Sequence, residues 1–495
     1  MPQIINTNMA SLNSQRHLNA TQSALSQAME RLSSGRRINS AKDDAAGLGI
    51  SERMTSQING MNQAIRNARD GISLGQTAEG ALSTMNDMLQ RVRVLAVQAS
   101  NATNSPADRQ ALQDEVGQLV SELNRLAEVT TFNGQHLLNG TMGTQYFQVG
   151  PNAGEAIGAN GTNFMTTTYG NYRVHKGSTV PIATGYTSPP TPPTKAVGAY
   201  RLTGYKGSEL LNITTTDSAR TIVEKVNNLS GDTGITATAK TTACLKMVPG
   251  TYAFELVSNN ETPVSVSFAI GTDLTLSDSF AAAVNAINAQ TAKTGVIAEY
   301  DATNQGIKLT NQNGNDISMS DRITTNAAGN ADIRGYAANG TLSGHPPIAI
   351  AGGDNQFGTV AGVVTLDSPN SFVSEVVTTG SAYDLLGTGE LMPVSSLDVS
   401  TFDEAQKSLV IVDSALVHIV GEMARYGALQ ARFEATISNL EVTAENTTNS
   451  RSRIQDADYA QETAALSRAS ILQQAGTSML AQANQIPQTV LGLLQ

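Results

Sequence analysis

The sequence predicts a mainly α-helical protein with an inserted α+β region, and three observations support this fold class. Long stretches at both ends place apolar residues at alternating spacings of three and four, as in helices that pack on one another. The stretch between them is rich in Thr, Ser, Gly and Asn and contains strand-like runs. The two helical ends match in pattern although they are far apart in the sequence. We therefore expect both chain ends to form a long antiparallel coiled-coil rod, with a β-rich central region facing solvent.

The first helix is predicted to end at a glycine. Leu18, Leu25 and Leu32 lie seven residues apart, as residues on one face of a packed helix do. Gly35 follows this row, and glycine readily adopts the left-handed conformation that commonly ends helices. The first helix is thus expected to stop near residue 35.

Two adjacent carboxylates, Asp43 and Asp44, come just before the next helical stretch. Carboxylates at a helix start accept hydrogen bonds from free backbone amides and interact favourably with the helix dipole. A metal or acid pair is the alternative interpretation, and capping is the one we favour.

Three further helical stretches follow, from residue 45 to about 99, after residue 105, and after residue 401. Ser105-Pro106-Ala107-Asp108 is a strong helix-start signal, with a capping hydroxyl before a proline. Thr401-Phe402-Asp403-Glu404 has the spacing of a capping box. Between the second and third stretches the sequence predicts turns at Asn133-Gly134 and Asn139-Gly140 and a short strand at residues 146–149.

The central region contains an internal repeat at an offset of 61 residues. Each copy is predicted to contain a cap, a short helix, a turn and a strand. The matching positions are Asp217-Ser218 with Asp278-Ser279, Val226-Asn227 with Ile287-Asn288, and Gly234 with Gly295.

The C-terminal segment has no Asp, Glu, Lys or Arg after Arg468. Amides such as Gln473 and Gln482 interrupt it too often for a membrane span. Instead, apolar residues recur every seven in two rows, and we expect the two rows to form one seam against other helices. The first row is Ala465, Leu472, Met479, Ile486 and Leu493, and the second is Ala469, Gly476, Ala483 and Val490.

One seam is too weak to hold this segment by itself. Burying its five largest apolar side chains contributes roughly 7–15 kcal/mol, whereas ordering its residues costs on the order of 1–2 kcal/mol each. Because residues 1–15 also lack charge, we expect the two ends to pair with each other and then with other copies, becoming ordered on assembly. A tail docked on its own domain is the alternative. The predicted subunit-packing residues are Leu472, Met479, Ile486, Val490 and Leu493, with Leu18, Leu25 and Leu32.

Composition excludes several function classes. The net charge of −11 and the pI near 5.0 argue against nucleic-acid binding. Cys244 is the one cysteine, so we expect no internal disulfide and no thiol metal site, and we interpret it as a buried hydrophobe. The histidines are scattered, and the catalytic and phosphate-binding motifs are missing. We expect no enzymatic activity, cofactor or metal, no Sec-type signal peptide and no membrane insertion.

Two long motifs at opposite ends of the chain resemble bacterial flagellins. The N-terminal motif, residues 32–47, reads LSSGRRINSAKDDAAG, and the C-terminal motif, residues 471–488, reads ILQQAGTSMLAQANQIPQ. The resemblance covers roughly residues 1–150 and 400–495, and the repeat is similar to modules inserted in some flagellins.

The resemblance implies a homopolymer, the extracellular flagellar filament used for motility, exported by the flagellar type III channel. It also implies a flagellar cap, an export chaperone on the C-terminal tail and hook-junction proteins as partners. The domains it implies are an N-terminal inner-tube helix (residues 1–44), N-terminal coiled-coil helices with a β-hairpin (45–177), a variable surface region with the repeat (178–395), a C-terminal coiled-coil helix (396–450) and a C-terminal inner-tube helix (451–495).

Many flagellins are also recognised by Toll-like receptor 5. The family's receptor-binding stretch resembles residues 89–98, LQRVRVLAVQ, together with Glu115 on the next helix. By that match the receptor contact falls on Arg91, Leu95 and Glu115. Val94 stands where the family often has an acidic residue.

Two alternatives to the filament subunit stay open at this point. A hook–filament junction protein would share the terminal helices but assemble as a short ring. A filament subunit whose central region also binds glycans is the second alternative.

Overall fold

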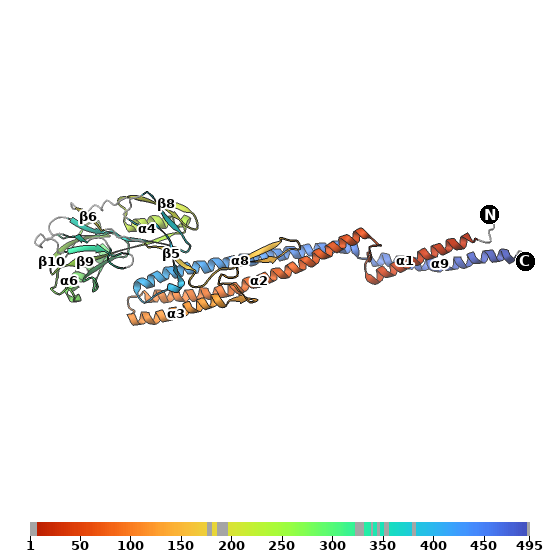
Figure 1. The fold of residues 1–495 in the computed structure, drawn as a ribbon, viewed down its shortest axis with the longest axis horizontal. Helices are drawn as coiled ribbons and strands as arrows, with labels where there is room; N and C mark the ends of the chain where they lie inside the picture. Colours follow the sequence, from red (N-terminus) through yellow and green to blue (C-terminus); the bar gives the residue numbers. More distant parts are fainter. Residues whose placement is uncertain are drawn as a thin grey trace. The chain divides into compact units, whose positions relative to one another are not determined.

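The computed structural model describes residues 7–175, 181–185, 197–321, 331–337, 340–343, 347–350, 356–378 and 383–492. In this part of the chain, both chain ends form long helices and the sequence between them forms strands and short helices, which confirms the predicted fold class (Figure 1). The chain forms two compact units. The first comprises residues 1–79, 142–161 and 425–495, and the second comprises residues 80–141 and 162–424.

The first unit is built from helices of both chain ends. It contains α1 (Met9–Ser34), α9 (Tyr459–Gly492), the first part of α2 (Ala45–Ala99) and the last part of α8 (Phe402–Gln455). Here α2 and α8 run antiparallel, because Arg451 donates to Thr55 Oγ1 at 3.3 Å and Arg69 pairs with Glu441 at 3.3 Å. The predicted antiparallel pairing of the chain ends is therefore present in this unit.

A small hairpin covers the α2–α8 pair in the first unit. Its strands are β3 (Thr144–Gln148) and β4 (Ala156–Asn160), which pair antiparallel in the region of the predicted short strand. Phe147 packs edge-on against Phe433 of α8, with ring centroids 5.6 Å apart. Phe433 is fully buried, and Gly71 of α2 makes room for its ring.

The second unit holds the remaining halves of α2 and α8 and the helix α3 (Pro106–Val129). Ser105 and Asp108 form a reciprocal capping box at the predicted start of α3. At the start of α8, Thr401 Oγ1 accepts from Glu404 N at 3.2 Å, while the Glu404 carboxylate bonds Lys407. The short strands β1 (Thr131–Phe132) and β2 (Gln135–His136) meet at the predicted Asn133-Gly134 turn, where both residues have positive φ.

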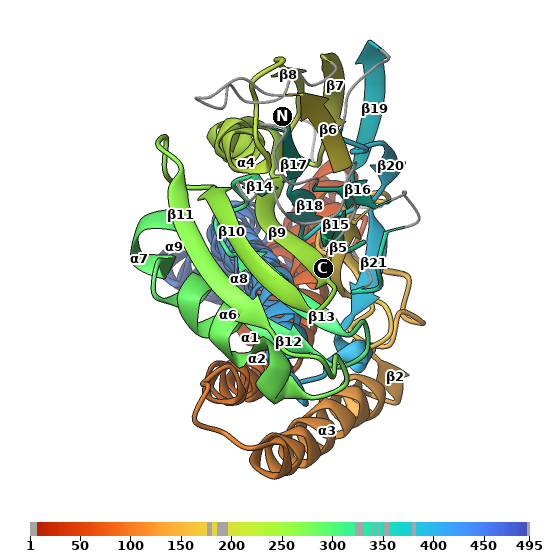
Figure 2. The same cartoon turned by 90° about the vertical axis from the view of Figure 1, so that its left-hand side faces the viewer.

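The central region contains three antiparallel sheets among the described residues (Figure 2). The first has the order β12-β13-β9-β18-β5-β21, with β15 pairing β9 and β16. The second has the order β11-β10-β14-β17-β6, and the third β20-β19-β7-β8. Their strands, in chain order, are β5 (Gly170–Val174), β6 (Pro181–Gly185), β7 (Gly198–Thr203), β8 (Ser208–Ile213), β9 (Thr236–Met247), β10 (Gly250–Val257), β11 (Val264–Ile270), β12 (Val296–Asp301), β13 (Gly306–Asn311), β14 (Ile317–Asp321), β15 (Ala331–Gly335), β16 (Ile348–Ala349), β17 (Gln356–Val360), β18 (Val363–Ser368), β19 (Val373–Thr378), β20 (Gly387–Thr388) and β21 (Glu390–Pro393).

The two copies of the 61-residue repeat adopt the same helix–turn–strand unit. The first is α4 (Ala219–Asn228), α5 (Ser230–Thr233) and β9, and the second is α6 (Ser277–Asn288), α7 (Thr291–Thr294) and β12. The Asn227 side chain donates to Ala237 O and accepts from Ala237 N. Asn288 makes the same two bonds with Ala298. This amide clamp fixes each helix against the strand that follows it.

The helix starts differ between the copies. Ser218 caps α4 by accepting from Thr221 N, as predicted. The prediction of a matching cap at Asp278-Ser279 is wrong, because α6 begins at Ser277 and both residues lie in its first turn. Gly271 N bonds Ser279 O, so the preceding loop ties down this earlier start.

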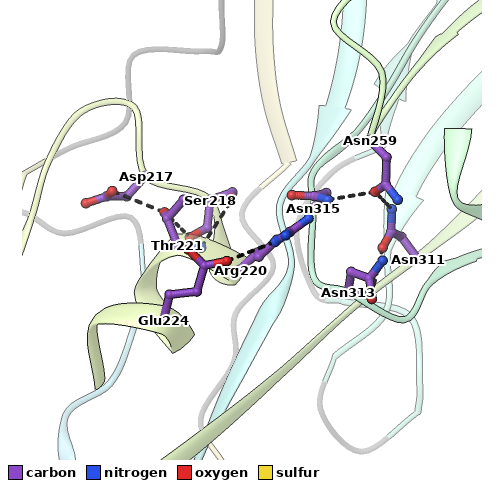
Figure 3. A network of polar contacts seen from close by, with 9 residues as sticks. All are labelled: Asp217, Ser218, Arg220, Thr221, Glu224, Asn259, Asn311, Asn313 and Asn315. Atoms are coloured by element: carbon purple, nitrogen blue, oxygen red, sulfur yellow. Dashed lines mark hydrogen bonds and ion pairs between the residues drawn. The ribbon is translucent and has the colours of Figure 1, made fainter. Parts of the chain in front are cut away.

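Polar contacts surround the first turn of α4 and the nearby loop between β13 and β14 (Figure 3). Arg220 N donates to Gly314 O at 3.2 Å. The loop that contains Gly314 is held by Asn259, whose Oδ1 accepts from Asn311 at 2.8 Å and from Asn315 at 2.6 Å. The loop between β13 and β14 therefore accepts a backbone hydrogen bond from the first turn of α4.

Cys244 lies in β9 and is fully buried, as expected of a small hydrophobe. Burial raises the pKa of its thiol above the usual value. The thiol is therefore not activated as a nucleophile.

We predict that Gly71→Ala destabilises the chain relative to Gly80→Ala in the same helix. A Cβ at position 71 would lie 2.6 Å from Cζ of the buried Phe433 ring, whereas nothing lies within 4 Å of a Cβ at position 80. Overpacking costs about 1–3 kcal/mol, while replacing a helical Gly by Ala gains about 1 kcal/mol. Urea unfolding followed by far-UV circular dichroism measures the difference. Equal midpoints would contradict the packing described at Phe433.

Candidate assembly surface

Helices α1 and α9 form an antiparallel pair held by polar contacts at both ends. Near the start of α1, Asn8 Nδ2 donates to Ala483 O at 2.8 Å, and Ser11 Oγ donates to Asn484 Oδ1 at 2.7 Å. Near its end, Arg31 pairs with Glu462 at 3.1 Å, and the Glu462 side chain is 12% exposed. Charge-assisted and neutral bonds thus set the register of the pair at opposite ends.

One row of α9 packs on α1, and we call it the inner row: Ala469, Gly476 and Ala483. Ala469 and Ala483 are buried, and a Cβ on Gly476 would lie 3.4 Å from Leu18 Cδ1. On α1 the half-buried Leu18, Leu25 and Leu32 form the facing row. Small residues on α9 let the leucines of α1 approach closely, so this contact fills the space between the two helices.

The neighbouring row of α9 is left uncovered, and we call it the outer row: Leu472 and Met479. Their exposed fractions are 52% and 64%. The prediction that both rows form one seam is therefore corrected for the single chain, because α1 is wide enough to cover only the inner row. The side chains of Ile486 and Val490, and the whole of Leu493, lie outside the part of the chain that the structure describes.

Further large apolar side chains of the pair are also exposed. Among the described residues they are Met9, Leu12 and Met29 on α1 and Tyr459 and Ile471 on α9. Covering such half-exposed side chains contributes on the order of 1 kcal/mol each. From residue 469 to residue 492, α9 carries no charged side chain that would oppose enclosure. The pair is thus stabilised when other apolar helices cover this surface.

A tight joint connects this pair to α2 and α8. Gly35 ends α1 with a φ of 68°, as predicted. Ala457 N donates to Gly35 O at 3.0 Å, and Arg37 N donates to Gln455 O at 2.7 Å. Backbone hydrogen bonds therefore hold the two chain segments together where they pass through the joint.

The two carboxylates at the joint bond different segments. Asp44 Oδ1 accepts from Gly47 N in the first turn of α2. Asp43 accepts from the backbone amide and hydroxyl of Ser40, and these bonds lower the pKa of its carboxyl. The capping interpretation is confirmed for Asp44, whereas Asp43 accepts from the backbone of Asn39 and Ser40 in the turn before α2 and does not cap the helix. Across the described residues, no group of three or more His, Cys, Asp and Glu side chains could hold a metal ion.

The residues matched to receptor binding lie in the second unit and differ in exposure. Arg91 and Glu115 form an ion pair at 2.7 Å with side chains 53% and 42% exposed. Leu95 is buried among the core residues of α2, so its side chain is not accessible for the direct receptor contact predicted for it. Val94 is 55% exposed. In the part of the chain that the structure describes, no helix is long and apolar enough to cross a membrane.

Comparisons with known proteins match the whole chain. Residues 5–143 match the family described as bacterial flagellin N-terminal helical region, and residues 409–494 match its C-terminal helical region. The chain is 40% identical to B-type flagellin of Pseudomonas aeruginosa, covering 99% of both chains. It is 36% identical to a flagellin of Salmonella choleraesuis, covering 100% of both. A solved structure of FliC from Burkholderia pseudomallei matches 73% of this chain and 99% of that chain, with 20% identity and a TM-score of 0.30.

We predict that the two rows of α9 respond differently to substitution. Leu472→Gln with Met479→Gln should change the free energy of unfolding of the free chain by less than about 0.5 kcal/mol. The same variant should lose seeded self-association. Ala469→Gln with Ala483→Gln should lower the helical content of the free chain, because the longer side chains do not fit against α1. Circular dichroism and sedimentation measure the two effects. Loss of helix in the first variant as large as in the second would contradict the assignment of the rows.

Proposed function

Because the chain belongs to the bacterial flagellin family, whose members are structural subunits of the flagellar filament, we propose that the outer row of α9 drives its polymerisation. The filament subunit is the function that the full-length flagellin matches support. The observation behind the proposed mechanism is the exposure of Leu472 and Met479 on a helix without charge beyond Arg468. Such a surface is covered only when helices of neighbouring subunits pack against it.

The division of labour within the subunit is part of this proposal. Residues 1–44 and 451–495 form the inner tube, and residues 45–177 and 396–450 form the coiled-coil layer around it. Residues 178–395 face solvent. In support, the outer-row residues belong to the terminal pair, and the α2–α8 pair has its own buried core with Leu440 and Met61.

We further propose that the subunit is exported through the flagellar type III channel and meets the flagellar cap, an export chaperone and hook-junction proteins. The uncharged C-terminal segment supports the chaperone proposal, because an exposed apolar helix must be shielded before assembly. No observation favours the hook–filament junction alternative, and we also expect no enzymatic activity.

Toll-like receptor 5 is proposed as a host partner through the Arg91–Glu115 pair. This pair is half-exposed, so its charges can reach a partner. Leu95 is buried and can act only by supporting the helix surface. The residues around it in the core, such as Leu89 and Val92, serve packing.

We predict that Arg91→Ala with Glu115→Ala abolishes receptor signalling by the free subunit. Removing both partners leaves neither charge unpaired, so the fold should be retained. Arg125→Ala with Glu122→Ala removes an ion pair of similar exposure on α3 and is the control. A receptor-reporter assay measures the response. Unchanged signalling in the first variant would exclude this contact.

We predict that a chain ending at Ser450 forms no filaments when seeded. It lacks α9 and therefore both rows, while the cores of α2, α3 and the central sheets remain. Electron microscopy compares it with the full chain, for which long tubes are expected. Tubes from both would mean that the coiled-coil layer alone carries assembly, and short rings from the full chain would favour the junction protein.

A further inference from the structure

One face of the central sheet is polar and borders a cleft. Strand β9 places Thr238, Lys240 and Thr242 at alternate positions on this face, and β18 adds Thr365. Alternate residues of β9, such as Ala243 and Leu245, instead enter the buried core. The cleft has a volume of about 1100 Å³ and is closed by the β12–β13 loop and the first turns of α8.

Three ion pairs line the cleft, whose lysine and arginine side chains are matched in number by its carboxylates. Lys240 bonds Asp403 at 2.8 Å, Lys308 bonds Glu299 at 2.7 Å, and Lys407 bonds Glu404 at 2.6 Å. Each of these lysine and carboxylate side chains is 30–58% exposed. An ammonium group has three donors and a carboxylate has several acceptor positions, so each pair has capacity for ligand hydroxyls. A balanced lining gives no preference to a polyanion or a polycation.

Uncharged hydrogen-bonding groups and one exposed ring complete the lining. Asn304, Gln312 and Gln406 contribute amides. The aromatic residue Phe402, at the start of α8, is 42% exposed. Pockets for apolar small molecules are lined mainly by apolar side chains, whereas polar and apolar groups contribute in similar measure to this lining. Amides and charged pairs suit vicinal hydroxyls, while a ring face suits the C–H face of a sugar.

The loop at one wall of the cleft is fixed before any ligand binds. Asp301 accepts from Tyr336 Oη, from Asn304 Nδ2 at 2.7 Å and from Thr303 N at 2.9 Å. A wall held by such bonds loses little conformational freedom on binding. The cleft is therefore preorganised on this side.

We propose that this cleft binds an oligosaccharide. The proposal goes beyond filament assembly, because none of the cleft residues belongs to α1 or α9. Ligand hydroxyls bond the Lys240–Asp403 and Lys308–Glu299 pairs, and a sugar ring lies against Phe402.

The test uses the full chain kept as free subunit. An array of neutral and acidic oligosaccharides identifies ligands, and calorimetry measures their affinity. We expect a neutral oligosaccharide to bind, and Lys240→Ala with Asp403→Ala to weaken it at least about tenfold. Phe402→Ala should also weaken binding while leaving both ion pairs in place.

The matched control is Arg220→Ala with Glu224→Ala, which removes an exposed ion pair of α4 outside the cleft. Its affinity should equal that of the unchanged chain. Circular dichroism establishes that each variant is folded. The proposal is overturned if no oligosaccharide binds, if only polyanions bind, or if cleft and control variants have the same affinity.

Discussion

The structure depends on a geometric limit of the α1–α9 pair: one helix covers only one stripe of another. α1 covers the inner row of α9, where Ala469 and Ala483 are buried, and leaves Leu472 and Met479 exposed. Within the described residues nothing covers the outer row, and in the proposed function other copies of the chain do so. On this proposal, polymerisation follows from incomplete burial within the subunit and requires no specific charge or catalytic group.

The other elements of the subunit are held by their own contacts and leave the outer row free for assembly. At the joint, backbone bonds from Ala457 and Arg37 hold the two crossing segments together. Beyond the joint, α2 and α8 bury their own apolar residues, among them Phe433, so the terminal pair is not required for that core. The central sheets have separate cores, and their amide clamps at Asn227 and Asn288 depend on contacts within each repeat. Assembly and folding thus draw on different apolar surfaces.

Local patterns predicted the elements well, whereas partners in space were harder to predict. Ser105 and Gly35 carry their signals within a few residues, so the start of α3 and the end of α1 follow from sequence. The seven-residue rows of α9 identify apolar stripes but do not say which helix covers each one. Leu95 lies four residues after the exposed Arg91 yet faces the core, which a linear motif does not reveal. The cleft combines side chains from several strands and α8, whose pairing no local signal specifies.

Methionine oxidation shows whether neighbouring copies cover the outer row, because it reports the exposure of single side chains. Met479 is 64% exposed in the free chain, and Met85 is fully buried. With dilute peroxide, Met479 should oxidise rapidly in the free subunit and be protected in the filament, while Met85 stays slow in both. Equal oxidation of Met479 in free subunit and filament would show that neighbouring copies do not cover the outer row, and would contradict the account.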